Sequence, residues 1–493
     1  MRRSHSASPR RPPSGRPYPG TSLPLAVLTL ALAAALPAGP RGLAAQEPAI
    51  LFEGGRLLAG DGSPPVESSA FLVSGGRFVA VGTEGGIEVP DGAARVDLRG
   101  RTVIPAFVDL HSHPGYEKVS EKTQLKENYT PANLTDHLER YAYTGHGITV
   151  SLGSDPPDAW VWEMRRESEQ PPFTGARFET VGRGLAWPGT GPMVAARNDT
   201  PYAVFTPWLA EVAVRELAAH GVPFVKIWVE DRRGFQVPGA EGPFVLDADI
   251  SGAAIAEAHR LGVRTIAHVK TVPELKDLLR GGVDAWTHPI DDAHADGELL
   301  SLLAERPGLW YIPVFTPSLA GGAGERRAGE PPAWIDDPLL RAVDCPAFLD
   351  RWGAELARRP LPAAGGGIGG ENARAFRRAG VRFALGSHDA GGNRLHGWGT
   401  HMELEAYVHW LGMSPNEAIT AATGAGAEFL GRSDLGTVEA GKSADFVVLD
   451  ANPLDDIRNT RRISRVFLRG AEVDRPAMRA RWASECAAVA AAR

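Results

Sequence analysis

Two kinds of hydrophobic pattern alternate along the chain. Between residues 50 and 103, strand-like runs such as ILFEGGRLLAG and SSAFLVSGGRFVAVG are separated by glycine and proline turns. The same texture returns near the other end, in SADFVVLDANP and ISRVFLRGAEV. Short apolar runs bounded by turn residues are typical of β-strands. Neither piece is long enough to bury a face alone, so the pattern predicts one small β-sandwich built from both chain ends.

The segment between these pieces has a different rhythm, with eight short and nearly continuous apolar runs. Such runs are typical of parallel strands that are buried on both faces. The runs begin at Val103, Ile148, Phe178, Phe224, Val263, Val283, Leu309 and Val381. Helical patterns separate several of them, including Ile250 to Leu261, Pro273 to Arg280 and a capping box at Ser414 to Glu417. Strand alternating with helix eight times predicts an α/β fold of the TIM type, a (β/α)₈ barrel.

These patterns predict where the parts of the chain begin and end. We expect the first part of the sandwich at 46–103, the barrel at 104–432, the second part of the sandwich at 433–473, and a C-terminal helical tail at 474–493. A chain of 493 residues is long enough for one large and one small domain.

Residues 1–45 have the order of a cleaved signal peptide. They contain six arginines and no acidic residue, then an apolar run from Leu23 to Leu36, then small residues before Gln46. The apolar run is short for a membrane span, so we expect export to the periplasm or the exterior and no stable membrane association after cleavage. The Arg10–Arg11 pair is a weak indication of twin-arginine export. An uncleaved anchor is the alternative.

Composition excludes some classes of protein. Without the six N-terminal arginines the net charge changes from −7 to −13, and no basic tract follows, so nucleic acid is not an expected partner. Cys345 and Cys486 are the only cysteines, which excludes a disulfide framework and leaves a single bridge without support from the sequence.

Polar residues at the ends of the predicted strands point to a metal site. His111 and His113 end the first strand, and alternate residues of a strand face the same side. Further along, Lys226 lies in the fourth strand, and the fifth, sixth and eighth end at His268, His288 and Asp389. A single buried histidine is more often a hydrogen-bonded core residue than a ligand. Five imidazole and carboxylate groups at the same end of one barrel instead favour one or two divalent cations such as zinc.

The chain resembles the amidohydrolase superfamily, especially its imidazolonepropionase-like and prolidase-like members. The motifs that carry the resemblance are VIPAFVDLHSHPG, GVPFVKIWVED, TIAHVK, GVDAWTHPI, RFALGSHDAGG and DLGTVEAGKSADFVVLDANP. The resemblance implies that His111 and His113 bind the more buried of two metals and that His268 and His288 bind the other. It also implies that Lys226, carbamylated at its amine, bridges both metals, and that Asp389 is both a metal ligand and the catalytic acid/base. His388 departs from the pattern, because a small residue usually precedes the aspartate. It is a candidate substrate contact and could also hydrogen-bond Asp389 or point into the barrel wall, which we favour.

This resemblance implies hydrolysis of an amide-like C–N bond, in a dipeptide, N-acyl amino acid or cyclic amide. A water held between two metals is readily deprotonated, and the resulting hydroxide attacks the carbonyl. Two alternatives remain: a lactone or phosphotriester hydrolase with the same binuclear site, and a catalytically inactive metal-bearing binding protein. The intact Asp389 argues against the latter.

Substrate contacts are predicted on the loops that follow the strands. Tyr116 follows the HSH motif, and Trp187, Arg197 and Tyr202 lie in the loop after the third strand. Arg197 could hold a substrate carboxylate through two hydrogen bonds. Ordinary loop packing is the alternative for all four, and the sequence leaves open whether the chain forms a homo-oligomer.

Overall fold

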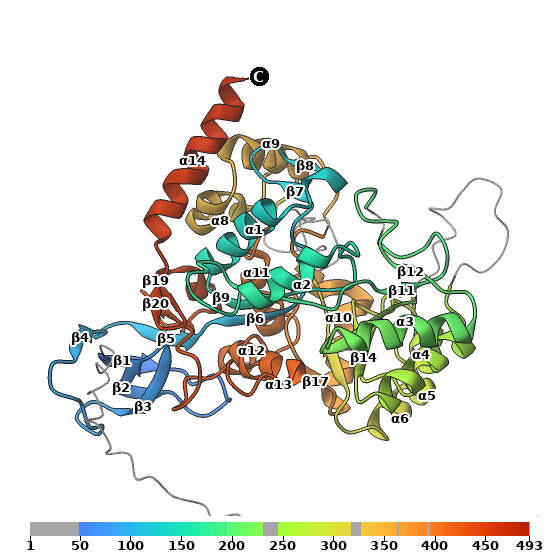
Figure 1. The fold of residues 1–493 in the computed structure, drawn as a ribbon, viewed down its shortest axis with the longest axis horizontal. Coiled ribbons are helices and arrows are strands. Elements are labelled where there is room, and N and C mark those ends of the chain that lie inside the picture. The colour runs from blue at the N-terminus through green and yellow to red at the C-terminus, as the bar shows by residue number, and fades with distance from the viewer. Residues whose placement is uncertain are drawn as a thin grey trace, which may run out of the picture. The chain divides into compact units, whose positions relative to one another are not determined.

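The computed structural model describes residues 49–192, 194–229, 245–316, 327–361, 364–391 and 395–492. The predicted signal peptide at 1–45 lies outside these residues. Within the described part, each of the eight predicted apolar runs contains a β-strand (Figure 1). The eight strands are β6 (Phe107–Ser112), β9 (His146–Ser151), β10 (Arg177–Thr180), β13 (Phe224–Trp228), β14 (Arg264–His268), β15 (Ala285–Thr287), β16 (Trp310–Ile312) and β17 (Arg382–Phe383).

These strands pair in parallel, as strands joined by helical crossovers do. One sheet has the order β10-β9-β6, and a second has the order β12-β11-β13-β14-β15-β16-β17. The short strands β11 (Leu185–Ala186) and β12 (Tyr202–Ala203) extend the second sheet. The assigned strands therefore form two parallel sheets rather than one closed sheet, in the strand order expected for a (β/α)₈ barrel.

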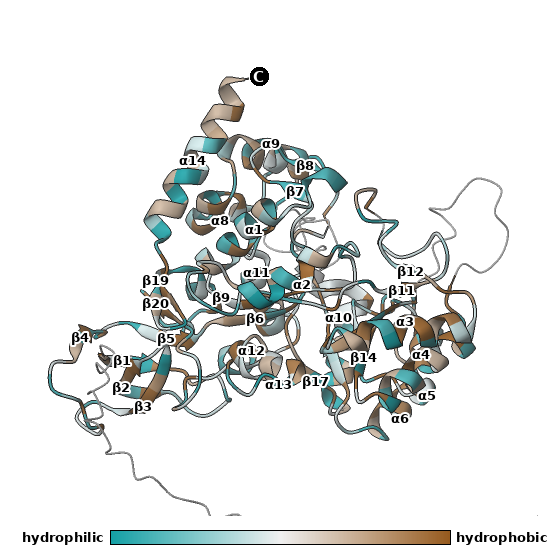
Figure 2. Cartoon of the chain, viewed as in Figure 1, coloured by the Kyte–Doolittle hydropathy of each residue, from teal (hydrophilic) through white to brown (hydrophobic). Residues whose placement is uncertain are grey.

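Helices follow the strands, and their ends agree with the capping signals of the sequence. The predicted capping box is present, since the Ser414 side chain accepts a hydrogen bond from Glu417 N and the Glu417 side chain accepts one from Ser414 N. Most helices combine hydrophobic and hydrophilic residues (Figure 2). They are α1 (Pro131–Tyr143), α2 (Ala159–Glu167), α3 (Pro207–Ala219), α4 (Ala248–Arg260), α5 (Val272–Gly281), α6 (Gly297–Ala304), α8 (Pro338–Val343), α9 (Pro346–Ala357), α10 (Gly367–Arg378), α11 (Gly399–His409), α12 (Pro415–Ala421) and α13 (Gly424–Leu430).

A separate eight-stranded sheet combines strands from both ends of the described chain. Its order is β20-β19-β18-β5-β1-β2-β3, with β4 pairing with β1. Five phenylalanine rings, those of Phe52, Phe71, Phe78, Phe446 and Phe467, pack together with neighbouring centroids 4.6–5.8 Å apart. The strands are β1 (Ile50–Leu57), β2 (Val66–Ser74), β3 (Arg77–Thr83), β4 (Ala94–Asp97), β5 (Thr102–Pro105), β18 (Phe446–Leu449), β19 (Ile463–Leu468) and β20 (Ala471–Glu472).

The first predicted barrel run divides between the two sheets. Residues Thr102–Pro105 pair with β1 and β18, whereas Phe107–Ser112 pair with β9. The predicted start of the barrel at residue 104 therefore falls inside a strand of the small sheet. Hydrophobicity does not reveal this division, because both halves of the run are buried.

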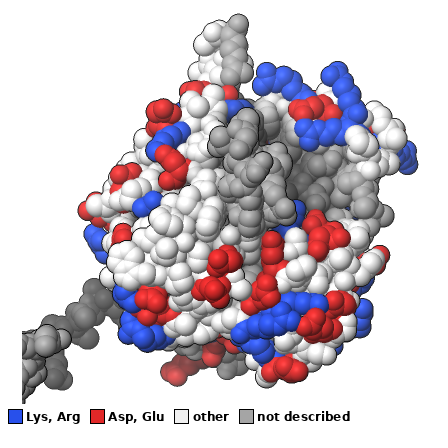
Figure 3. Space-filling model, turned by 90° about the vertical axis from the view of Figure 1, so that its right-hand side faces the viewer, with Lys and Arg blue, Asp and Glu red and all other residues white. Residues whose placement is uncertain are grey.

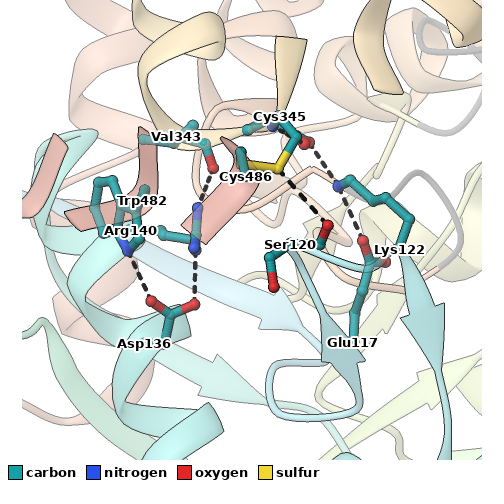
Figure 4. The surroundings of a disulfide bond; sticks show 10 residues. Glu117, Ser120, Lys122, Asp136, Arg140, Val343, Cys345, Trp482 and Cys486 are labelled. Carbon is teal, nitrogen blue, oxygen red and sulfur yellow. Dashed lines mark hydrogen bonds and ion pairs between the residues drawn. A yellow bond between two sulfur atoms is a disulfide. The ribbon is translucent and has the colours of Figure 1, made fainter. Parts of the chain in front are cut away.

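A disulfide joins Cys345 to Cys486 and so attaches α14 (Arg475–Ala491) to the start of α9 (Figure 4). Beside it, the Lys122 ammonium donates to Glu117 in β7 (Glu117–Lys118), at 2.9 Å, and to Asp344, at 2.7 Å. β7 forms a hairpin with β8 (Thr123–Gln124). The sequence left this bridge without support, because the two cysteines are 141 residues apart. It is the fold that brings them together.

Acidic and basic side chains are interspersed on the face shown in Figure 3. On the neighbouring helices α5 and α6, Lys276 pairs with Asp296 and with Glu298, both at 2.7 Å. Among the described helices, none has the length and apolar character required to cross a membrane.

Candidate metal centre

The ends of several parallel strands bring buried histidines together. His111 lies near the end of β6, His268 is the last residue of β14, and His288 directly follows β15. The centroid of the His111 ring is 5.2 Å from that of His113 and 5.0 Å from that of His288. The ring centroids of His268 and His288 are 4.0 Å apart. Histidines from three strands of the predicted set thus meet at one place.

Hydroxyl groups orient the two histidines of the HSH motif. His111 Nδ1 lies 2.7 Å from Thr287 Oγ1, and His113 Nδ1 lies 2.8 Å from Ser154 Oγ. The Nε2 atoms of His111, His113 and His288 are buried and have no hydrogen-bond partner among the described residues. Buried polar atoms are normally partnered. When Nδ1 carries the proton and donates it to a hydroxyl, the Nε2 lone pair remains available, so these residues fit a divalent cation.

The protonation state of the cluster also suits metal binding. Burial, followed by the positive charge of Lys226, lowers the pKa of His111 well below its usual range. Burial and the charge of Arg197 do the same for the pKa of His113. These imidazoles are therefore neutral near pH 7, and neutral imidazole is the form that binds metals.

Lys226 lies in the middle of β13 and is completely buried. Its Nζ is 4.8 Å from the centre of the Trp228 ring. Gly153, with φ of +82°, passes so close that a Cβ there would collide with the Lys226 side chain. The sequence-predicted lysine is thus held beside the histidines, where its cationic form disfavours their protonation.

Asp389 lies beyond the end of β17 and is fully buried. Its Oδ2 accepts a hydrogen bond of 3.0 Å from Gly399 N at the start of α11, and its backbone oxygen accepts one of 2.9 Å from His113 N. A Cβ at Gly399 would collide with the Asp389 carboxylate, so a glycine is required at this close approach. The eighth strand end is therefore joined to the first by a direct backbone contact.

His388 does not point into the barrel wall, so the interpretation favoured from the sequence is wrong. Its ring centroid lies 4.7 Å from that of His111 and 4.9 Å from that of His113. One nitrogen of His388 lies within 4.8 Å of ligand nitrogens of His111 and His288. The reason is the backbone, since a φ of +56° interrupts the strand alternation that would have turned this side chain outward.

The four other predicted substrate contacts differ in position. The Arg197 guanidinium is buried near His113, whose pKa it affects, and its Nη2 donates to Gly391 O at 2.8 Å. Tyr116 is 1% exposed, and its hydroxyl donates to the backbone oxygen of Ser154. Tyr202 contacts Arg183 and Glu216 rather than the histidines, and Trp187 packs in part against the main core.

Several residues around the cluster were missed from the sequence. Asp109 accepts hydrogen bonds from Ser387 Oγ at 2.6 Å and from His111 N at 3.1 Å, and burial raises its pKa to about 6. The sequence did indicate this residue, because Asp109 lies two positions before His111 and therefore on the same face of the strand. The hydroxyls of Ser154 and Thr287 had no comparable signal, although both residues lie at or next to predicted strand ends.

Comparison with known proteins agrees with this site. Residues 102–473 match the Amidohydrolase family. The chain is 25% identical over 443 residues to a 5-methylthioadenosine/S-adenosylhomocysteine deaminase from Symbiobacterium thermophilum, an alignment that covers 82% of this chain and 85% of that protein. It is 26% identical over 416 residues to an imidazolonepropionase from Salinispora arenicola, covering 80% and 88%.

Solved structures with similar folds include a Xaa-Pro dipeptidase with bound methionine in its active site and a molinate hydrolase. The dipeptidase has a TM-score of 0.64 and 22% identity, with 86% of this chain and 99% of that chain covered. The molinate hydrolase has a TM-score of 0.65 and 21% identity, with 87% and 96% covered. These likenesses imply the TIM-barrel fold with a β-sandwich domain.

The chain belongs to the Amidohydrolase family. The predicted class, a metal-dependent hydrolase that acts on C–N bonds of small molecules, is thereby confirmed. Divalent metals are general in this family, and the histidine cluster is compatible with them.

Proposed function

We propose that the protein hydrolyses an amide-like C–N bond of a small molecule at a binuclear zinc centre. The observation that carries this proposal is the set of buried Nε2 atoms on His111, His113 and His288, which have no hydrogen-bond partner among the described residues. A nitrogen-rich donor set suits zinc. When bound, the metals supply Lewis acidity, which lowers the pKa of water and polarises the scissile carbonyl.

The protein's own residues have distinct roles in this proposal. His111, His113, His268 and His288 hold the metals, and the hydroxyls of Thr287 and Ser154 fix the orientation of the first two. The Asp389 carboxylate accepts the proton of the attacking water and returns it to the leaving nitrogen. Gly399 N donates to one oxygen of this carboxylate and so orients it for proton transfer.

Lys226 is proposed to act as its carbamate. A buried ammonium group beside His111 and His113 is costly, because it is desolvated and repels cations. Carbamylation converts this cation into an anion with two oxygen donors, which is what a bridge between two metals requires. The burial of Lys226 among the imidazoles supports this assignment.

The substrate is proposed to carry a carboxylate next to the scissile bond, as dipeptides and N-acyl amino acids do. Arg197 lies near the metal-facing His113, on the loop after β11. Guanidinium groups bind carboxylates through paired hydrogen bonds. The name of the structurally similar Xaa-Pro dipeptidase agrees with cleavage of a C–N bond.

The parallel strands are proposed to close into one eight-stranded barrel with the metal centre at its mouth. Leu110 N donates to Leu385 O at 3.0 Å, and Gly184 N donates to Gly153 O at 2.9 Å. The first hydrogen bond connects β6 with the residues that follow β17, and the second connects the residues that follow β9 with those that precede β11. They support closure at the positions where the assigned strands stop.

Export through the N-terminal segment 1–45 is proposed from its basic, apolar and small-residue order. The disulfide between Cys345 and Cys486 supports this location, because disulfides persist mainly in oxidising compartments. N-terminal sequencing of the exported protein should give a start near Gln46. A mature protein that begins at Met1 would contradict the proposal.

A metal assay and a substrate screen test the function together. We expect about two zinc ions per chain by elemental analysis, and hydrolysis of dipeptides, N-acyl amino acids or cyclic amides by the zinc-loaded protein. Lactones and phosphotriesters serve as the comparison, because the same centre could attack them. Faster cleavage of these esters, or activity in a protein with only trace metal, would overturn the proposal.

A further inference from the structure

The end of the eighth strand carries a histidine beside the predicted catalytic aspartate. His388 directly precedes Asp389 in the segment RFALGSHDAGG. Its backbone N donates to His111 O at 2.6 Å, which fixes it beside the first strand. Its φ of +56° lies in the left-handed region, which is uncommon for a residue with a Cβ. Such unfavourable conformations concentrate at functional sites.

This backbone turns the imidazole toward the other histidines. Its ring centroid is 4.7 Å from that of His111 and 5.1 Å from that of His288. One ligand nitrogen from each of the three rings lies within 4.8 Å of the others. Two nitrogens that share one cation at ordinary metal–nitrogen distances of about 2.0–2.1 Å lie at most about 4.2 Å apart, so a set of nitrogens within 4.8 Å is close to the spacing that a shared cation requires.

The neighbouring carboxylate is held differently. One oxygen of Asp389 accepts a hydrogen bond from Gly399 N, and the close approach of the Gly399 backbone confines the group at the start of α11. Asp389 is not part of the set of ligand atoms that converge within 4.8 Å among the described residues. The eighth strand thus presents an imidazole to His111 and His288, with the carboxylate beside it.

We propose that His388 is a metal ligand, which adds an imidazole nitrogen to the centre beside those of His111 and His288. This inference rests on the proposed function, since it adds a ligand to the same centre. It also separates two roles at the strand end: His388 contributes to holding the metal, whereas Asp389 is left to carry the proton.

The test variant is His388→Gly in the full chain, because glycine adopts a positive φ without strain and the substitution removes the whole side chain, including the imidazole. His396→Ala is the matched control. His396 is also buried and lies in the same stretch of chain, but its ring packs on His137, 4.5 Å away, rather than on the cluster. The measurements are the Zn²⁺ dissociation constant by chelator competition and the visible spectrum of the Co²⁺-loaded protein.

We expect His388→Gly to weaken metal binding by at least about tenfold and to change the Co²⁺ spectrum, and added imidazole to reverse both effects. His396→Ala should match the wild type in both measurements. An unchanged dissociation constant and spectrum in His388→Gly, with metal bound and activity present in the wild type, would overturn the inference and leave the proposed function intact. A wild-type chain that binds no metal would overturn both.

Discussion

Two groups of buried histidines in this protein are distinguished by their hydrogen bonds. At the strand ends, His111 and His113 each place Nδ1 against a hydroxyl, and each Nε2 is without a hydrogen-bond partner among the described residues. Elsewhere in the core, His146 bonds through both nitrogens, to Thr400 Oγ1 and to Tyr141 O, and His401 bonds through both, to Thr460 Oγ1 and to Thr144 O.

This difference shows that burial alone does not identify a histidine as a metal ligand. All four side chains are at most 1% exposed, and burial lowers the pKa of each. What separates them is whether the second nitrogen is satisfied by the protein. Because an unpaired buried donor or acceptor costs free energy, the first group is expected to be stabilised by a cation and the second is complete without one.

Among the substitutions that test this difference, Lys226→Ala should have the largest effect on metal content and activity. Removing the bridge should release the second metal and reduce activity to the background rate, whereas the core histidines are unaffected. A short-chain carboxylic acid should partly restore both metal content and activity, because it can replace the lost carboxylate. Metal analysis and mass spectrometry check the expectation. An unmodified Lys226 in fully active, metal-loaded enzyme would contradict it.

Asp389→Asn should have the next largest effect. If the carboxylate transfers the proton, we expect kcat to fall about 10²- to 10⁴-fold, the usual contribution of general acid–base catalysis. The loss should appear mainly in kcat, because the proton moves in the transition state rather than in the bound substrate. Asparagine keeps the size of the side chain, so the fold should persist.

The measurement is kcat at equal, verified metal content between pH 5 and 9. The acidic limb of the pH–rate profile should shift or disappear in the variant. A metal-replete Asp389→Asn enzyme within about threefold of the wild type would place the proton carrier elsewhere.

Strand periodicity explains why the histidines chosen from the sequence lie close together in the fold. His111 and His113 alternate on one strand, and the apolar runs before His268 and His288 identify their strands. His388 was misassigned, since its position depends on a left-handed backbone that hydrophobicity does not encode. The same limit applies to Thr287 and Ser154, whose hydroxyls matter only through contacts with residues distant in sequence.

Distant pairing also explains what could not be predicted of the fold. The bond between Cys345 and Cys486 and the division of the run at Thr102–Pro105 both depend on which segments meet in space. Local pattern identifies strands and helices, whereas these features are set by tertiary contacts. The alternation of strand and helix nevertheless identified the architecture.

Thr287→Val should produce a smaller effect that is confined to the first group of histidines. Valine has nearly the shape of threonine but cannot accept the hydrogen bond from His111 Nδ1, so the ring and its tautomer are less well fixed. We expect metal affinity to fall about 10- to 100-fold, the usual effect of removing such a partner. Thr287→Ser keeps the hydroxyl and should restore most of the affinity. Equal zinc affinity in Thr287→Val and wild type would show that the hydroxyl does not orient the ligand.

The smallest effect on activity is expected from His146→Gln, which tests the second group through stability. Burial lowers the pKa of His146 to about 3 in the folded protein, whereas an unfolded histidine titrates near pH 6.5. Between these values the unfolded chain binds the extra proton, so this residue's contribution to stability is present above pH 6.5 and is lost as the pH falls toward 3. One such proton corresponds to about 1.4 kcal/mol per pH unit. Glutamine cannot take up a proton in this range, so the free energy of unfolding should fall less steeply on acidification by about that amount.

Urea unfolding of both proteins at several pH values between 4.5 and 7.5 measures the two slopes, and metal content at pH 7.5 should be equal. Parallel pH dependences would show that His146 is not held neutral by the core, and lost metal would show that the two groups of histidines are coupled.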